Sequence, residues 1–151
     1  MHRSEELRYL ILAAQREGNR MLAQALKPLG VTPSQAEVLS LLRTRQPLSL
    51  NGLGDLLVCE SGSSPSRLVE RLVAAGLVER VVDDVDRRHI RLSLTADGTR
   101  IAGEIAAIEN ELHAAIDSVS AGHNMDEVTG LLWTLVGDLP AGRALSRRKG
   151  G

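Results

Sequence analysis

Arginine and serine side chains gather on one face of a helix predicted between residues 61 and 80. With a rotation of about 100° per residue, Ser63, Ser64, Arg67 and Arg71 fall on the same side, and Leu68 falls on the other. An arginine guanidinium can bind guanine or phosphate through two hydrogen bonds, and small serines let a helix approach DNA closely. This face predicts contacts in the DNA major groove. The alternative is an ordinary amphipathic helix with two solvated arginines.

A charged hairpin follows this helix. Leu77–Val82 and Ile90–Leu94 predict two strands, and the residues between them are mostly charged. Asp86, Arg87 and Arg88 occupy the predicted tip. We expect Asp86 to orient one arginine while the other projects, because a projecting arginine suits the narrow, electronegative minor groove. The alternative is a hairpin tip that is merely solvated.

The elements that must position this helix and hairpin come earlier in the sequence. Apolar residues at steps of three and four predict a first helix from Ser4 to about Leu29. Thr32 and Gln35 form a capping box around Pro33, which suits the first position of a helix, and they predict the start of a second helix.

A short helix and a turn lead into the arginine-bearing helix. The short helix is predicted from Leu50 to about Val58, and Glu60–Ser63 forms the turn after it. The arginine-bearing helix then begins near Gly62 or Ser64. We favour Ser64 as the cap over an earlier serine, Ser61. Pro65 then takes the first helical position, where its missing N–H is harmless.

The C-terminal third carries more apolar surface than a small lobe can cover. Thr95 is predicted to cap a long fifth helix whose isoleucines form a seam for another helix. Met125–Leu139 is predicted to be the last helix, and the Arg- and Gly-rich tail Ala141–Gly151 is predicted to be frayed. The simplest partner for the seam is a second copy of the chain. A two-fold homodimer would place two copies of the arginine-bearing helix and its hairpin one turn of DNA apart.

Composition fits one globular domain of 151 residues. Aromatic residues make up 1% of the chain and phenylalanine is absent, so the core must consist of Leu, Val, Ile and Ala. This favours packed helices over a large sheet. The net charge of −1 gives no indication of nucleic-acid binding. All but two of the 18 basic residues are arginine, which a bias in composition would also produce.

Enzymatic and metal chemistry find little support in the sequence. The single cysteine, Cys59, excludes an internal disulfide framework, and the neighbouring Glu60 would raise its pKa. The histidines lack metal-ligand spacing and no catalytic serine motif is present, so we expect no metal, no cofactor and no enzymatic activity. The N-terminus lacks a signal-peptide pattern, and no apolar run approaches the roughly 20 residues of a membrane span. We therefore expect a cytoplasmic protein without membrane contact.

The chain resembles the MarR family of winged helix-turn-helix transcriptional regulators in three segments that occur in this order: LGVTPSQAEVLSLL (Leu29–Leu42), SRLVERLVAAGLVER (Ser66–Arg80) and DVDRRHIRLSLTADG (Asp84–Gly98). The most specific part is Asp-Arg-Arg followed by Leu-Thr and Gly. The resemblance implies a mainly α (α+β) fold in a single domain, residues 1–151. Residues 1–30 and 99–151 would form dimerisation helices, and residues 31–98 the winged helix-turn-helix DNA-binding lobe.

The resemblance also implies roles for individual residues. Four residues match the DNA-contacting positions of the recognition helix: Ser64, Ser66, Arg67 and Arg71. Arg88 matches the arginine at the tip of the wing, with Asp86 as its partner. Residues 60–65 depart from the family pattern because they are richer in serine and glycine.

The function implied by the resemblance is repression from double-stranded DNA. A homodimer would bind a pseudo-palindromic operator and release it when a small organic ligand binds between the dimerisation helices and the DNA-binding lobe. We expect a pocket between the first, second and fifth helices, lined by Tyr9, Arg16 and Met21. Two alternatives remain open: an oxidant sensor that uses Cys59, and a winged helix that docks a protein partner instead of DNA.

Overall fold

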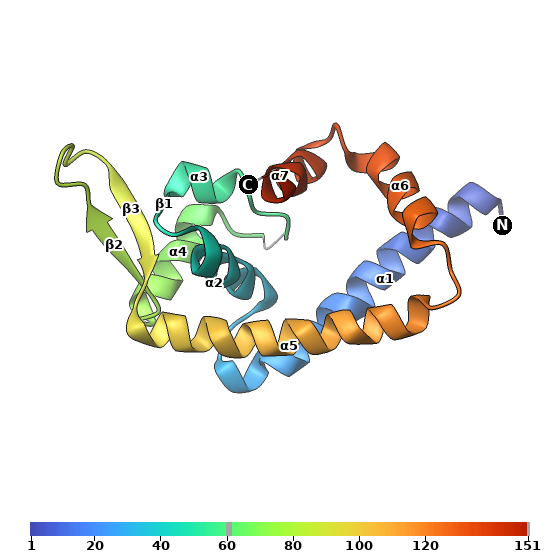
Figure 1. Ribbon diagram of the computed structural model, residues 1–151, viewed down its shortest axis with the longest axis horizontal. Coiled ribbons are helices and arrows are strands. Elements are labelled where there is room, and N and C mark those ends of the chain that lie inside the picture. Colours follow the sequence, from blue (N-terminus) through green and yellow to red (C-terminus); the bar gives the residue numbers. More distant parts are fainter. Residues whose placement is uncertain (60–61, 151) are drawn as a thin grey trace.

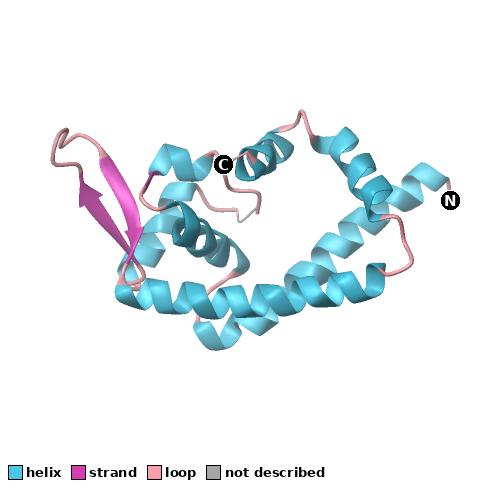
Figure 2. Ribbon diagram, viewed as in Figure 1, coloured by secondary structure: helices cyan, strands magenta, loops and turns pink. Residues whose placement is uncertain are grey.

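The computed structural model of the chain describes residues 1–59 and 62–150. The elements occur in the order α1 (Arg3–Leu26), η1 (Lys27–Leu29), α2 (Pro33–Arg45), β1 (Leu48–Ser49), α3 (Leu50–Gly54), α4 (Pro65–Ala74), β2 (Val78–Val82), β3 (Ile90–Leu94), α5 (Ala96–Ser120), α6 (Met125–Val136) and α7 (Pro140–Lys149). Helices dominate, and the strands lie together at one end of the molecule (Figure 2). The predicted mainly α fold with a small β wing is confirmed. The first two residues of the predicted turn, Glu60 and Ser61, and the last residue of the tail, Gly151, lie outside the described residues.

The strands form one antiparallel sheet in the order β1-β3-β2. Leu92 of the central strand pairs with Leu48 on one side and with Arg80 on the other. The predicted hairpin is therefore confirmed, with β2 beginning at Val78. Figure 1 shows this hairpin projecting beside the start of α5, at the opposite end of the molecule from α6.

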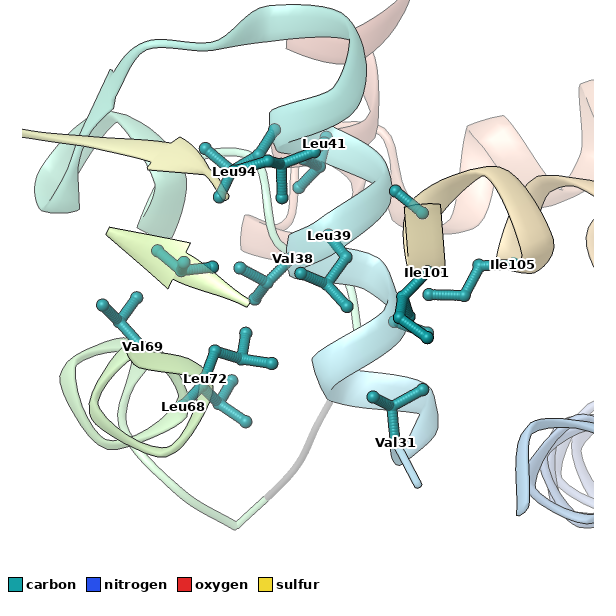
Figure 3. Packing of buried hydrophobic residues seen from close by; sticks show 14 of the residues in the cluster. Val31, Val38, Leu39, Leu41, Leu68, Val69, Leu72, Leu94, Ile101 and Ile105 are labelled. Atoms are coloured by element: carbon teal, nitrogen blue, oxygen red, sulfur yellow. The ribbon is translucent and has the colours of Figure 1, made fainter. Parts of the chain in front are cut away.

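The hydrophobic core lies around α2. Val38 and Leu39 are fully buried, and Figure 3 shows them between Leu72 of α4 and Ile105 of α5. The core cluster contains only Leu, Val, Ile and Ala, as the composition predicted. Burying one such large side chain contributes about 1.5–3 kcal/mol. The core therefore holds α4 firmly against α2 and, through α2, against α5.

Capping hydrogen bonds fix where the helices of this lobe begin. The Oγ1 atom of Thr32 accepts from the N–H of Gln35 at 3.2 Å, and Oε1 of Gln35 accepts from the N–H of Thr32 at 3.0 Å. This is the predicted capping box. The Oγ atom of Ser64 accepts from the N–H of Arg67 at 3.3 Å, and Pro65 takes the first position of α4. The preferred start of the arginine-bearing helix is confirmed.

Two predicted helix ends are wrong. The first helix stops at Leu26 and continues as the 3₁₀ turn η1, because Pro28 has no N–H with which to continue the α-helical pattern. The third helix stops at Gly54 instead of Val58. The N–H of Val58 donates to the carboxylate of Glu37, a distant side chain, and not to a carbonyl of its own helix.

The prediction of a frayed C-terminal tail is also wrong. Helix α6 ends at Val136 rather than Leu139, and the tail forms the additional helix α7. Leu139 is the extended residue before α7, and Nε of Arg143 donates to the carbonyl of Asp138 at 2.8 Å. Gly142 is buried against the backbone at the end of α6. Long-range contacts with α2 also hold α7, and a local sequence pattern cannot reveal them.

The long helices leave apolar surface uncovered. Helices α1 and α5 cross and contact one another, and α6 contacts α7 (Figure 1). The exposed apolar residues of α6 are Met125, Val128, Leu131, Leu132, Leu135 and Val136. In the first half of α1, Leu10 is 59% exposed and Leu12 is 45% exposed. None of the described helices is both long enough and apolar enough to cross a membrane.

Candidate nucleic-acid interface

Helix α4 turns its polar face away from the core. Its buried residues are Leu68, Val69 and Leu72. The residues predicted to contact DNA are Ser63, Ser64, Ser66, Arg67 and Arg71. All are exposed except Ser63, which lies just before the helix and is half-buried. The structure therefore leaves the serines and arginines of α4 accessible to solvent, with the two arginines one helical turn apart.

The first turn of α4 borders a groove. The groove has a volume of about 300 Å³ and lies between α3 and α4, with Asn51, Asp55, Ser64 and Ser66 among its lining residues. The N-terminal end of a helix carries partial positive charge, which favours a phosphate. In α4 the N–H of Arg67 already donates to Ser64 and Pro65 has none, so this charge is the main contribution. The start of α4 is thus suited to the DNA backbone, while Arg67 and Arg71 lie further along the helix.

The wing tip holds Arg88 in a defined orientation. Asp86 accepts from Nε of Arg88 at 3.1 Å and from Nη2 at 3.2 Å, so the ion pair is bidentate. The same carboxylate accepts from the N–H of Arg88 at 3.1 Å. The side-chain bond from Arg88, followed by the backbone bond, lowers the pKa of Asp86 below its ordinary value. The Arg88 side chain is 89% exposed, and Arg87 beside it is also exposed.

Backbone hydrogen bonds shape the turn around this ion pair. The N–H of His89 donates to the carbonyl of Asp86 at 2.9 Å, and the N–H of Asp83 donates to the carbonyl of His89 at 3.0 Å. The side chain of Asp83 also accepts from the N–H of Val85 at 3.0 Å. The aspartates of the tip therefore fold the loop and orient its arginine, and their role is not limited to adding negative charge.

A cavity of about 850 Å³ lies between α1 and α5 and is closed on one side by the segment after α3. Its lining residues are Ala14, Gln15, Glu17, Gly18, Asn19, Met21, Leu22, Val58, Cys59, Leu112, Ala115, Ile116 and Val119. Met21 lines this cavity, and its role in ligand binding stays a prediction. Tyr9 and Arg16 are not among the described lining residues, and Tyr9 instead stacks with Arg8 at 4.3 Å. The cavity also differs from the expected one in that α2 does not line it.

Two residues beside this cavity, Glu37 and Arg148, were not predicted from the sequence. Glu37 is 8% exposed, accepts hydrogen bonds from the N–H groups of Val58 and Cys59, and pairs with Arg148 of α7. The sequence feature that could have indicated Glu37 is a carboxylate between two apolar residues of α2. Burial and then Glu37 raise the pKa of the Cys59 thiol to about 11. The predicted acidic neighbour of Cys59, Glu60, lies outside the described residues.

Comparison with known proteins identifies the lobe. A family model described as a winged helix DNA-binding domain matches residues 31–98. The reduced form of MarR from Escherichia coli is 30% identical, with a TM-score of 0.63, and the match covers 89% of this chain and 96% of MarR. The chain belongs to the MarR family. An E. coli MarR mutant complexed with operator DNA matches with a TM-score of 0.70 at 29% identity, covering 89% of this chain and 94% of that one. The organic hydroperoxide resistance transcriptional regulator of Bacillus subtilis is 26% identical over 90% of each chain.

As a member of the MarR family, the chain is a DNA-binding transcriptional regulator and not an enzyme. The family and fold predicted from the sequence are confirmed. The sequence resemblance assigns α4 to the recognition helix and the β2–β3 hairpin to the wing, and both elements lie within the matched residues 31–98. The individual DNA-contacting residues stay predictions.

Proposed function

We propose that this MarR-family regulator is a dimeric repressor of a pseudo-palindromic operator and that a small organic ligand releases it from DNA. The exposed Ser/Arg face of α4, next to a wing whose Arg88 is oriented by Asp86, carries the proposal. In it, Ser63, Ser64, Ser66, Arg67 and Arg71 face the major groove, and Arg87 and Arg88 reach the flanking minor groove. Because the partner is chromosomal DNA, the proposal places the protein in the cytoplasm.

The homodimer part of the proposal is supported by the exposed apolar residues of α1 and α6. Leu10 of α1 is 59% exposed, and Leu131 and Leu135 of α6 are each 48% exposed. The exposed apolar residues of α6 lie close together along one helix, and a large apolar patch usually marks an interaction site. A second copy of the chain would cover it and would duplicate the DNA-contacting face around a two-fold axis. The two DNA-contacting faces would then match the symmetry of a pseudo-palindromic operator.

The ligand part of the proposal is supported by the cavity between α1 and α5. Its volume of about 850 Å³ lies within the range of small-molecule sites, roughly 300–1,000 Å³. Leu112, Ile116 and Met21 give it an apolar wall suited to an organic molecule. Val58 and Cys59 also line it, and they precede the recognition helix in the sequence. An occupant would therefore touch the chain that leads to the DNA interface.

A cysteine-based oxidant sensor is the second candidate, because the B. subtilis relative is named for organic hydroperoxide resistance. Reaction with a peroxide requires the thiolate form of cysteine. A pKa of about 11 keeps Cys59 protonated at neutral pH. The raised pKa disfavours the reactive thiolate of the exposed Cys59, so the proposal takes the organic ligand as the signal.

Binding of the purified protein to duplex DNA from upstream of its own gene tests the proposal. Fluorescence anisotropy would compare this duplex with a scrambled one at two salt concentrations. We expect a preference for the native duplex that persists at physiological salt, together with weaker binding at higher salt because phosphate contacts release counterions. Equal binding to both duplexes would contradict an operator at that position. Absence of DNA binding would favour a winged helix that docks a protein.

A further inference from the structure

Glu37 is a carboxylate at a position where α2 otherwise buries apolar side chains. It lies between Ala36 and Val38, which are 1% and 0% exposed, and it is itself 8% exposed. A buried charge is expensive unless hydrogen bonds and an opposite charge compensate it. The N–H of Val58 donates to both carboxylate oxygens at 3.1 Å, and the N–H of Cys59 donates to Oε1 at 3.0 Å. Glu37 therefore holds the chain that follows α3.

The opposite charge comes from the C-terminal helix. Nη1 of Arg148 donates to Oε2 of Glu37 at 2.9 Å, and the Arg148 side chain is 30% exposed. Arg45 of α2 donates to the carbonyl of Arg148. Nη1 of Arg147 donates to the carbonyl of Asp55 at 3.0 Å. Figure 1 accordingly shows α7 beside α3, far along the sequence from it. Helix α7 thus contacts the segment after α3 both directly and through Glu37.

We propose that Arg148 is a positioning residue for DNA recognition, which acts through Glu37 to hold the segment Asp55–Cys59 and thereby sets the start of α4. The inference rests on the DNA interface proposed above. Asp55 at one end of the segment is fixed by Arg147, and Val58 and Cys59 at the other end are fixed by the Glu37–Arg148 pair. Ser64, the cap of α4, follows a few residues later.

Arg148 lies outside the main hydrophobic cluster, so its positioning role can be distinguished from general support of the fold. The main hydrophobic cluster draws on α1, α2, α3, α4, the sheet and α5, and its described members include no residue of α7. Loss of the Arg148 side chain therefore opens no hole in the core. It leaves the Glu37 carboxylate without its opposite charge, a cost that the carboxylate relieves by turning to solvent and releasing the segment. The expected result is release of one segment while the lobe stays folded.

Amide hydrogen exchange without DNA, together with operator affinity, tests the inference in the full-length protein. Arg148→Met should speed exchange of the Val58 and Cys59 amides while the amides of β2 and β3 keep their protection. Operator binding should weaken about tenfold, as when the binding-competent fraction falls to about one-tenth. Arg148→Lys should restore part of both. Lys149→Met removes the same charge from the same helix and is the matched control, because the contact described for exposed Lys149 is with Trp133 of α6.

A double-mutant cycle identifies the route of the effect. In a Glu37→Gln background, Arg148→Met should change operator affinity little, because the partner through which it acts is already altered. Full additivity of the two substitutions would overturn the inference. Unchanged exchange at Val58 and Cys59 in Arg148→Met would overturn it as well, whatever the DNA result. If the parent binds no operator, the proposed function fails, and faster exchange in Arg148→Met would still establish that Arg148 holds the segment.

Discussion

Substitution of Gly98 by alanine should destabilise the junction between the wing and α5. Gly98 lies in the first turn of α5 and is buried. A Cβ atom there would overlap the carbonyl oxygen of Leu77 and come within 2.9 Å of its carbonyl carbon. The obstacle is backbone, so it cannot rotate away as a side chain can. The same carbonyl accepts from the N–H of Thr95 at 3.1 Å, and that bond ties the start of α5 to the start of the wing.

The size of the effect follows from two opposing contributions. Forcing extra volume into a packed site costs about 1–3 kcal/mol, and a backbone obstacle favours the upper end. Alanine in place of glycine inside a helix recovers about 1 kcal/mol. We expect a net loss of about 2 kcal/mol, which corresponds to roughly 4–8 °C in melting temperature for a chain of this size.

Thermal unfolding followed by circular dichroism measures this loss. Gly103→Ala is the matched control, because Gly103 lies in the same helix and a Cβ there meets nothing within 4 Å. It should raise the melting temperature by a few degrees through helix propensity alone, about 1 kcal/mol. All variants are compared at one protein concentration, since the proposed dimerisation would make the melting temperature depend on it. If Gly98→Ala melts as high as Gly103→Ala, the close approach of α5 to Leu77 is refuted.

The remaining predictions concern the DNA interface and the thiol. Arg67→Ala should weaken operator binding and relax sequence preference by about 1–3 kcal/mol at the base it reads, whereas Arg88→Ala should weaken all duplexes and reduce the salt slope by about 1; anisotropy on an operator and its single-base variants separates the two. Asp86→Ala should also weaken binding, because Arg88 loses its orientation; tighter binding would show that Asp86 only repels phosphate. Alkylation of Cys59 should rise with pH around a midpoint near 11, because burial and Glu37 disfavour the thiolate. A midpoint near the ordinary value of 9.0 would contradict that environment.

The parts of the fold that were predicted correctly depend on neighbours in sequence. The capping box of Thr32 and Gln35 and the cap at Ser64 before Pro65 are hydrogen bonds that span three residues. Their residue types are therefore enough to indicate them. The same holds for the pairing of Asp86 with Arg88, which lie two residues apart at the wing tip.

The parts that were missed depend on residues far apart in sequence. The pairing of Glu37 with Arg148 joins positions separated by 111 residues. The pattern of residues within α7 does not indicate that its last turn contacts a buried carboxylate. The early end of α3 has the same origin, since Glu37 takes the N–H groups that a longer helix would have used. The cavity residues were predicted only in part. Of the three predicted from α1, Met21 lines the cavity, and Tyr9 and Arg16 are not among its described lining residues. Packing against α5 decides which side of α1 is enclosed, and the sequence of α1 alone does not show it.

The segment before the recognition helix is where the proposed ligand and helix α7 meet. Val58 and Cys59 line the cavity between α1 and α5, and they also line a second cleft, of about 450 Å³, against Arg143 and Arg147 of α7. A ligand alters DNA binding only if it binds the DNA-competent and DNA-incompetent arrangements with different affinity. The Glu37–Arg148 pair stabilises one arrangement of this segment, so an occupant of the cavity that favours another must act against that pair. In the proposed mechanism, the coupling between ligand and operator would therefore depend on the strength of the α7 contact as well as on the fit of the ligand in its cavity.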